Sequence, residues 1–145
     1  MLQGKLIGGS GKSAVINVSS GASYFPFTGS EIYSGAKLAI SYLAQGLDYE
    51  FKEEGHKVDF LDYRPGYVES KLSKHKASLG IPTAVQAATE VFRDLGRKKK
   101  THGWWYHDIL AWNIRFYGKY VPDSLQKMSY KRMTKIEGKI GNQSS

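Results

Sequence analysis

The sequence contains no cysteine, only four prolines and no long apolar run. Without cysteine, disulfides, thiolate chemistry and a zinc–thiolate site are excluded. The four histidines (His56, His75, His102 and His107) lack the H-E-x-x-H spacing, so we expect no metal site. No apolar run reaches the ~18 residues typical of a membrane-spanning helix, and the first residues lack the apolar segment of a signal peptide. The sequence therefore contains no targeting signal from which a compartment could be predicted.

The composition of the 145 residues, 41% hydrophobic and 23% charged, is typical of a globular chain with a core. The net charge of +8 is unevenly placed. Residues 1–92 hold nine basic and nine acidic residues, whereas residues 93–145 hold twelve basic and four acidic residues. A basic end favours an anionic neighbour, such as a membrane surface or a phosphate-bearing ligand, and a solvated tail is the alternative. No nucleic-acid-binding motif is present, so we expect no nucleic acid partner.

Hydrophobic periodicity predicts alternating strands and helices. Apolar or alternating segments favour strands at residues 13–19, 57–63 and, as a short third strand, 103–106. Apolar positions that recur at three and four favour helices at residues 31–54, 84–95 and 108–120. Gly55 ends the first helix, Thr83 is placed to cap the second, and residues 21–30 are expected to form a loop. This order predicts a parallel α/β sheet, although three strands are few for one and the first strand would leave an edge unpaired.

A Tyr-x-x-x-Lys pair, YSGAK at residues 33–37, opens the first predicted helix. Residues four apart lie on one face of a helix, so the Lys37 ammonium can approach the Tyr33 phenol and favour its phenolate. Such a phenol is a good proton donor or acceptor near neutral pH. The spacing alone is weak, because Tyr67 and Lys71 share it. However, Tyr33 also has Ser20 upstream of it, directly after a predicted strand.

Three segments in order resemble signatures of the short-chain dehydrogenase/reductase family: NVSS (residues 17–20), YSGAK and RPGYVES (residues 64–70). The resemblance implies that Ser20 hydrogen-bonds the substrate carbonyl, that Tyr33 passes the proton, and that Lys37 supports Tyr33 and binds the nicotinamide ribose. These three residues are the implied catalytic set. The implied cofactor-binding residues are Ser19, Tyr33, Lys37, Pro65, Gly66, Val68 and Ser70, and the implied substrate-binding residues are Ser20, Gly21 and Tyr67.

Simpler interpretations stay open for these residues. Ser20 is alternatively a capping serine, Tyr33 and Lys37 a surface pair, and Pro65-Gly66 a turn. Ser70 stands where the family usually has threonine, which keeps the hydroxyl.

The chain resembles in particular the branch of very-long-chain 3-oxoacyl-CoA reductases and microsomal 17β-hydroxysteroid dehydrogenases. The features are NVSSG (residues 17–21), Pro82-Thr83, Thr101-x-Gly103 before His107, and a basic C-terminal helix. The resemblance covers about residues 12–139, yet only the second half of such a protein. It implies a partial Rossmann-like α/β fold, a doubly wound parallel sheet without its N-terminal nucleotide-binding βαβ units. Residues 1–102 would belong to that domain, and residues 103–145 would form an aromatic, basic helical extension.

The family's Gly-rich cofactor turn has no counterpart in this sequence. Residues 8–13 (GGSGKS) suggest a phosphate-binding loop, but they precede a predicted strand instead of following one. We interpret residues 1–6 as the end of an upstream helix. We therefore expect that this chain alone does not bind NADP(H) productively.

Residues 103–121 (GWWYHDILAWNIRFYGKYV) are rich in tryptophan and tyrosine and are flanked by basic residues. As a helix, this segment suits a membrane interface, where such rings lie at headgroup depth. An apolar wall over a fatty-acyl or steroid site is equally consistent, and so is packing against the sheet.

Two functions are consistent with these observations. The first is NADP(H)-dependent reduction of a ketone, either a 3-oxoacyl-CoA or a ketosteroid. The resemblance implies the endoplasmic reticulum membrane surface, and the cytoplasm is the alternative. The second is a non-catalytic, dehydrogenase-derived interaction subunit, or a fragment that is inactive alone. Expected partners are a second copy or the missing N-terminal half through residues 31–54, and a membrane surface through residues 103–139.

Overall fold

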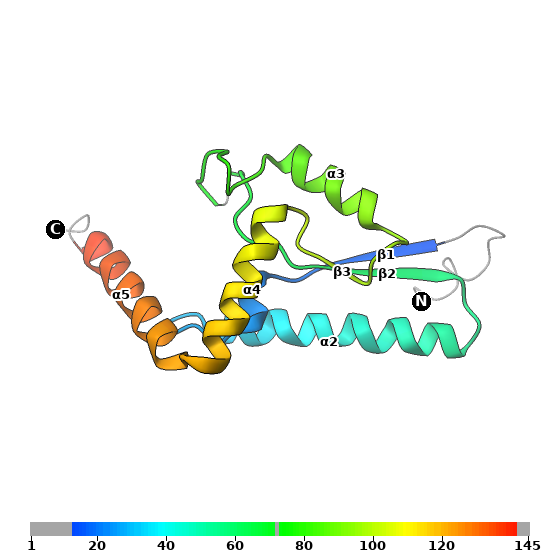
Figure 1. Cartoon of the computed structure of the whole chain (residues 1–145), viewed down its shortest axis with the longest axis horizontal. Helices are drawn as coiled ribbons and strands as arrows, with labels where there is room; N and C mark the ends of the chain where they lie inside the picture. Colours follow the sequence, from blue (N-terminus) through cyan, green and yellow to red (C-terminus); the bar gives the residue numbers. More distant parts are fainter. Residues whose placement is uncertain (1–12, 72, 142–145) are drawn as a thin grey trace.

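The described part of the chain, residues 13–71 and 73–141 of a computed structural model, is a small parallel sheet with helices on either side (Figure 1). The strands, in the sheet order β1-β2-β3, are β1 (Ser13–Val18), β2 (Val58–Tyr63) and β3 (Lys100–Thr101). The helices are η1 (Gly21–Tyr24), a 3-10 helix, and α2 (Glu31–Glu53), α3 (Ala84–Asp94), α4 (Trp105–Tyr120) and α5 (Pro122–Gly141). In Figure 1, α2 runs along one side of the strands and α3 along the other. This arrangement confirms the predicted partial Rossmann-like α/β fold.

The centre of the sheet is β2, which pairs with β1 over six residues and with β3 over two. Its Val58, Phe60 and Leu61 are buried, and Leu61 is fully enclosed. β1 is less buried, because among the described residues it pairs with β2 alone. The apolar core therefore lies under β2, and no other strand of the described ranges pairs with β1, as predicted from the small number of strands.

The long helix α2 extends from the predicted start to within a residue of the predicted end. It ends before Gly55, whose φ of +77° is a left-handed conformation that glycine adopts without a Cβ penalty. Its buried residues are Ser34, Ser41 and Ala44, and Ser41 reaches Asp62 of β2. On the opposite face, Ile32 and Leu43 are exposed. The helix is thus packed on one side only.

The prediction of a third strand at residues 103–106 is wrong. The third strand is the two-residue β3, where Lys100 pairs with Asp62 and Thr101 pairs with Tyr63. Extended structure stops at Gly103, which has a φ of +66° and lies against Tyr63, so that a Cβ there would be 2.6 Å from the Tyr63 ring. Helix α4 then begins at Trp105, three residues earlier than predicted. The cap of α3 agrees with prediction, since Thr83 and Gln86 form a capping box.

Helix α4 leaves most of its large apolar residues exposed. His107 and Ala111 are buried, and Gly118 lies so close to η1 that a Cβ would be 2.8 Å from the Phe25 ring. The large side chains that stay exposed are Trp105, Tyr106, Ile109, Leu110, Trp112, Phe116, Tyr117 and Tyr120. Packing of these aromatic rings into the core is therefore contradicted. No helix in the described ranges is long and apolar enough to cross a membrane.

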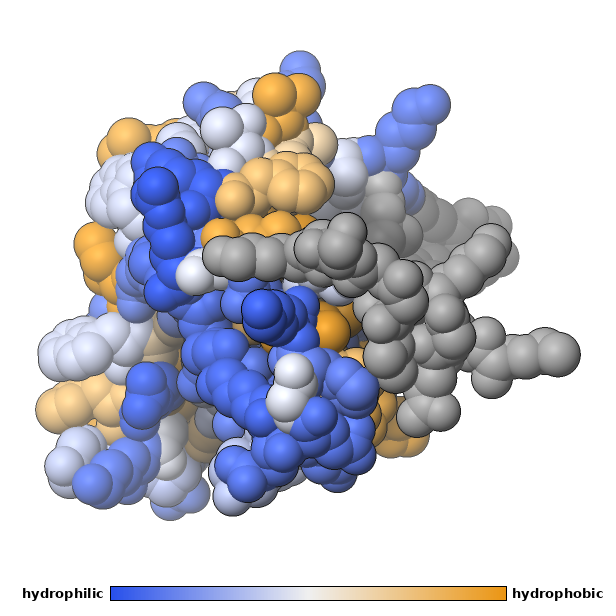
Figure 2. All heavy atoms as spheres, turned by 90° about the vertical axis from the view of Figure 1, so that its right-hand side faces the viewer, coloured by the Kyte–Doolittle hydropathy of each residue, from blue (hydrophilic) through white to orange (hydrophobic). Residues whose placement is uncertain are grey.

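The surface around the end of α2 is more hydrophilic than the exposed face of α4. Figure 2, viewed from the side where α2 ends, shows hydrophilic side chains over much of the described surface, with apolar patches between them. The interpretations of residues 1–6 and of residues 8–12 lie outside the described residues.

Candidate active site

The segment after β1 is held beside the segment after β2 by backbone hydrogen bonds. Ser19 N–H donates to the Tyr63 carbonyl at 2.8 Å, and Gly21 N–H donates to the Pro65 carbonyl at 2.8 Å. These bonds continue the parallel register past the strands. They bring Ser20 and Gly21 next to Pro65 and Gly66 at the carboxyl edge of the sheet, where ligands bind in open α/β sheets.

Ser20 is the N-cap of η1. Its Oγ accepts a hydrogen bond from Ala22 N–H at 3.1 Å, and its carbonyl accepts one from Ser23 Oγ at 2.7 Å. The capping interpretation is thus correct, but it leaves the Ser20 hydroxyl hydrogen without an acceptor among the described residues. The side chain is partly exposed, so capping fixes the oxygen while its O–H is available to a ligand carbonyl.

Tyr33 and Lys37 lie one turn apart on α2, as predicted. Lys37 Nζ donates to the Val18 carbonyl at the end of β1, at 3.2 Å, and lies 5.8 Å from the centre of the Tyr33 ring. The Tyr33 side chain is 50% exposed. One lysine therefore joins the start of α2 to the strand end that carries Ser20, and the three predicted catalytic residues share one edge of the sheet. Their roles stay a prediction.

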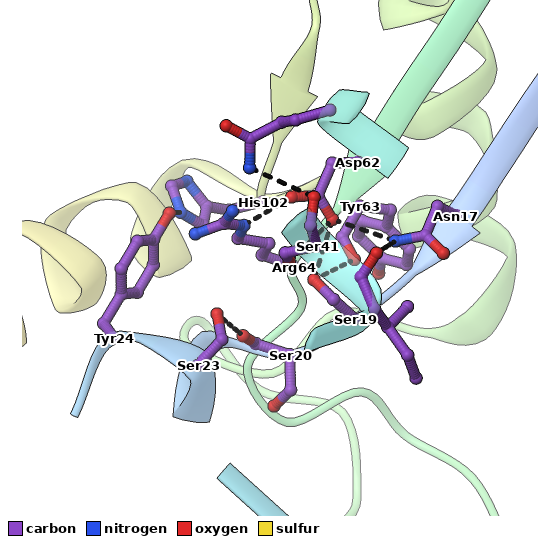
Figure 3. A network of polar contacts seen from close by, with 12 residues as sticks. Asn17, Ser19, Ser20, Ser23, Tyr24, Ser41, Asp62, Tyr63, Arg64 and His102 are labelled. Carbon is purple, nitrogen blue, oxygen red and sulfur yellow. Dashed lines mark hydrogen bonds and ion pairs between the residues drawn. The ribbon is translucent and has the colours of Figure 1, made fainter. Parts of the chain in front are cut away.

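Ser19 points the opposite way from Ser20. It is buried, and its Oγ donates to Asp62 Oδ1 at 2.8 Å (Figure 3). Successive residues of an extended chain face opposite sides, which explains the split. A cofactor contact by Ser19 stays a prediction, and it would have to involve an atom other than this hydroxyl.

Asp62 is the centre of a buried polar network that the sequence analysis missed. In Figure 3 its carboxylate receives hydrogen bonds from Ser19, Asn17 and Ser41 on Oδ1, and Arg64 Nε donates to Oδ2 at 2.7 Å. Asp62 and Arg64 are both buried. Paired charges of this kind are tolerated inside a protein because further hydrogen bonds satisfy the carboxylate. A charged pair two residues apart, at the end of an apolar strand, was the signal available in the sequence.

His107 packs behind Gly66, and it is the second part of the site that the sequence analysis did not predict. Gly66 N–H donates to His107 Nδ1 at 3.2 Å, and His107 Nε2 lies 3.1 Å from the Tyr67 carbonyl. These contacts fit a neutral imidazole with its proton on Nε2. Burial lowers the pKa of His107, which agrees with that state. A Cβ on residue 66 would be 2.8 Å from the His107 ring, so the glycine lets this ring pack directly against the backbone.

The remaining predicted residues lie on the loop that follows Gly66. The Tyr67 hydroxyl accepts a hydrogen bond from Arg132 of α5 at 2.6 Å, and its ring is close to His75. Ser70 is exposed, and its Oγ accepts from Ser73 N–H at 3.0 Å. Helix α5 thus anchors the loop that contains Tyr67, Val68 and Ser70.

The residues present fit a nicotinamide nucleotide in two respects. Lys37 uses one of its three ammonium N–H groups on Val18, so the others suit a ribose diol. The Pro65-Gly66 segment is held beside Gly21 at the same edge of the sheet and forms a wall next to Ser20. No group of three or more His, Asp or Glu residues that could hold a metal ion occurs in the described chain.

The chain belongs to the short-chain dehydrogenase family, which matches residues 3–78, just over half of its length. This is a family of oxidoreductases that generally bind NAD(P)(H). Within it, the chain is similar to the very-long-chain 3-oxoacyl-CoA reductase branch, which confirms the resemblance drawn from the motifs.

Three relatives define that similarity. The chain is 30% identical over 102 residues to very-long-chain 3-oxoacyl-CoA reductase-B of Danio rerio, covering 70% of this chain and 32% of the relative. It is 31% identical over 104 residues to very-long-chain 3-oxoacyl-CoA reductase of Macaca fascicularis, covering 71% and 33%. It is 27% identical over 119 residues to inactive hydroxysteroid dehydrogenase-like protein 1 of Homo sapiens, covering 79% and 34%. The chain therefore spans about a third of the length of these relatives.

Proposed function

We propose that this chain carries the Ser-Tyr-Lys part of an NADP(H)-dependent reductase that acts on a ketone, a 3-oxoacyl-CoA or a ketosteroid. The observation that carries the proposal is the Lys37–Val18 hydrogen bond, because it holds the Tyr33 helix against the strand end that leads to Ser20. The names of the relatives support a 3-oxoacyl-CoA as the substrate class.

The chemistry assigns one task to each of the three side chains. The Ser20 hydroxyl donates a hydrogen bond to the ketone oxygen and orients it. Tyr33 transfers its phenolic proton to that oxygen, and the Lys37 ammonium stabilises the phenolate that remains. Because Tyr33 is half exposed, solvent restores its proton. A bound NADPH would supply the hydride that completes the secondary alcohol, held by Lys37 and the Pro65-Gly66 wall.

The test compares Tyr33→Phe with Tyr49→Phe, an exposed tyrosine further along the same helix. NADPH consumption with a 3-oxoacyl-CoA is measured for the chain alone and for the chain joined to the cofactor-binding half of a related reductase. We expect turnover in the joined protein, a loss of at least about 100-fold for Tyr33→Phe, and little change for Tyr49→Phe. A folded joined protein without turnover, or equal effects of the two substitutions, contradicts the proposal.

A second function, a dehydrogenase-derived subunit that binds a partner, is favoured by the outer face of α2. Ile32, Ala36, Ala39 and Leu43 recur at helical spacing and are all exposed. We propose that this stripe contacts a second copy or the N-terminal, cofactor-binding half of a dehydrogenase. Analytical ultracentrifugation of Leu43→Glu, with Leu79→Glu as an exposed control outside α2, tests it. The stripe is not an interface between copies if both variants sediment like the unmodified chain.

We further propose that residues 103–139 lie on a membrane surface, at the endoplasmic reticulum, as the resemblance implies. The exposed rings of α4 and the basic residues of α5 support this. Sedimentation with lipid vesicles, and its loss in Trp112→Ala, is the expected result. Unchanged sedimentation of the variant would argue for an apolar wall or another partner.

A further inference from the structure

A groove separate from the Ser20, Tyr33 and Lys37 side chains opens between α2 and α4, beside β3. Its volume is about 630 Å³, and it is lined from η1, α2, the ends of β2 and β3, and α4. Four of its side chains are cationic: Arg64, Lys100, Arg115 and Lys119. No carboxylate among the described residues lines it. The whole chain has 21 basic and 13 acidic residues. The excess of positive over negative charge is therefore greater in this groove than in the chain as a whole.

Three of the four cations have no counter-ion among the residues that the structure describes. Arg64 is paired with Asp62, but within the described ranges Lys100, Arg115 and Lys119 make no salt bridge. Lys99, next in sequence to Lys100, is paired with Asp48 instead. Burial lowers the pKa of Lys100, and the charges of Arg64 and Arg115 lower it further, while Asp62 opposes them. An anion in the groove would relieve this repulsion.

The walls of the groove are held in place by contacts of Tyr24 and by the close packing of α4 at Gly118. The Tyr24 hydroxyl lies 2.9 Å from His102 Nε2, and the other ring nitrogen of His102 contacts Asp108. The Tyr24 ring in turn faces Arg64 at 4.9 Å and Arg115 at 5.7 Å. The absent side chain of Gly118 lets α4 approach η1. Arg115 and Lys119 are therefore presented from adjacent turns of a helix whose position is fixed.

We propose that this groove binds a phosphate-bearing ligand, with Lys100, Arg115 and Lys119 around the phosphate and Tyr24 and Tyr42 against its organic part. A carboxylate needs one cation, whereas three unpaired cations and a planar guanidinium suit a phosphomonoester or pyrophosphate. Such a group belongs either to a free nucleotide-like molecule or to an anionic lipid headgroup. The proposal is independent of ketone reduction, because none of the predicted catalytic residues lines the groove.

The test measures binding to the full chain by calorimetry with pyrophosphate and coenzyme A. It also measures co-sedimentation with phosphatidylcholine vesicles, with and without phosphatidic acid. The key variant is the double substitution Arg115→Gln with Lys119→Gln. Its matched control is Arg93→Gln with Arg97→Gln, which has the same spacing and charge change outside the groove. Because Arg115 packs on Tyr24, the single variant Lys119→Gln is measured as well, and circular dichroism checks the fold of each.

We expect saturable binding of a soluble phosphate or of the phosphatidic acid vesicles. It should weaken at least about tenfold in the groove double variant, to a smaller degree in Lys119→Gln, and by less than about twofold in the control. Binding of the soluble compounds identifies a free ligand, and binding of the vesicles alone identifies a headgroup. The proposal is overturned if none of the probes binds, or if the groove and control variants weaken binding equally.

Discussion

Two groups of polar side chains lie at the carboxyl edge of this sheet, and they differ in how far their hydrogen bonds are satisfied. Around Asp62, four side chains donate to one buried carboxylate. Ser20, Tyr33 and Lys37 are partly or largely exposed and keep donors that no described residue accepts. Neighbouring serines, Ser19 and Ser20, fall on opposite sides of this division. The buried group holds the strands and α2 together, and the exposed group is left available for a ligand.

If the buried network stabilises the fold, substitution of Asp62 at its centre should lower the free energy of unfolding the most. Asp62→Ala leaves the Arg64 guanidinium buried without a counter-charge, and we expect the free energy of unfolding to fall by about 3–5 kcal/mol. Urea denaturation followed by circular dichroism measures it. Asp59→Ala, on the same strand but less buried, should cost less than about 1 kcal/mol. Similar losses for the two would remove the distinction between the groups.

The next largest loss of stability is expected from a substitution of Gly66. In Gly66→Ala the new Cβ would lie 2.8 Å from the His107 ring, and we expect overpacking to cost about 1–3 kcal/mol. The control is Gly46→Ala on α2, where a Cβ meets nothing within 4 Å. That substitution should stabilise the helix by up to about 1 kcal/mol. A neutral Gly66→Ala would mean that His107 moves freely and does not define the wall.

The same contact predicts a dependence on pH. Burial lowers the pKa of His107 below its ordinary 6.5, so the unfolded chain binds this proton more readily than the folded one. The stabilising contribution is therefore complete above about pH 6.5 and is lost as the pH falls through the folded pKa. Between about pH 7.5 and about pH 5.5, the unmodified chain should lose more stability than His107→Gln. Parallel pH profiles would show that His107 is not responsible.

The smallest effect should come from two buried serines on α2. Ser41 Oγ donates to Asp62 at 3.2 Å, whereas Ser34 Oγ is the buried side-chain polar atom that lacks a partner in the described ranges. Ser41→Ala should lower the free energy of unfolding by about 1 kcal/mol, and Ser34→Ala should leave it unchanged or raise it by up to about 1 kcal/mol. Thermal denaturation of the pair checks the sign. An unchanged or higher free energy of unfolding in Ser41→Ala would contradict the assignment of Ser41 to the network.

Much of the architecture was predictable because it depends on local signals. The apolar run of β1, the helical spacing of α2, the stop at Gly55 and the cap at Thr83 all act within a few residues of their own position. The third strand was misplaced because β3 is two residues long, and its existence depends on pairing with Asp62 and Tyr63. The inward face of α4 was also not predictable, since it is set by the close approach of Gly118 to Phe25.

The amino-acid sequence alone determined the family and the order of strands and helices, and it predicted Ser20, Tyr33 and Lys37 as catalytic residues, because these are encoded in short motifs at set spacings. The tertiary structure decided which polar side chains at this edge are exposed, as Ser20 is in part, and which are buried, as Ser19 is. It brought Asp62 beneath Ser19, His107 behind Gly66, and unpaired Lys100, Arg115 and Lys119 around one groove. These groupings join residues far apart in the chain, and only packing of the strands and helices in three dimensions brings such residues together.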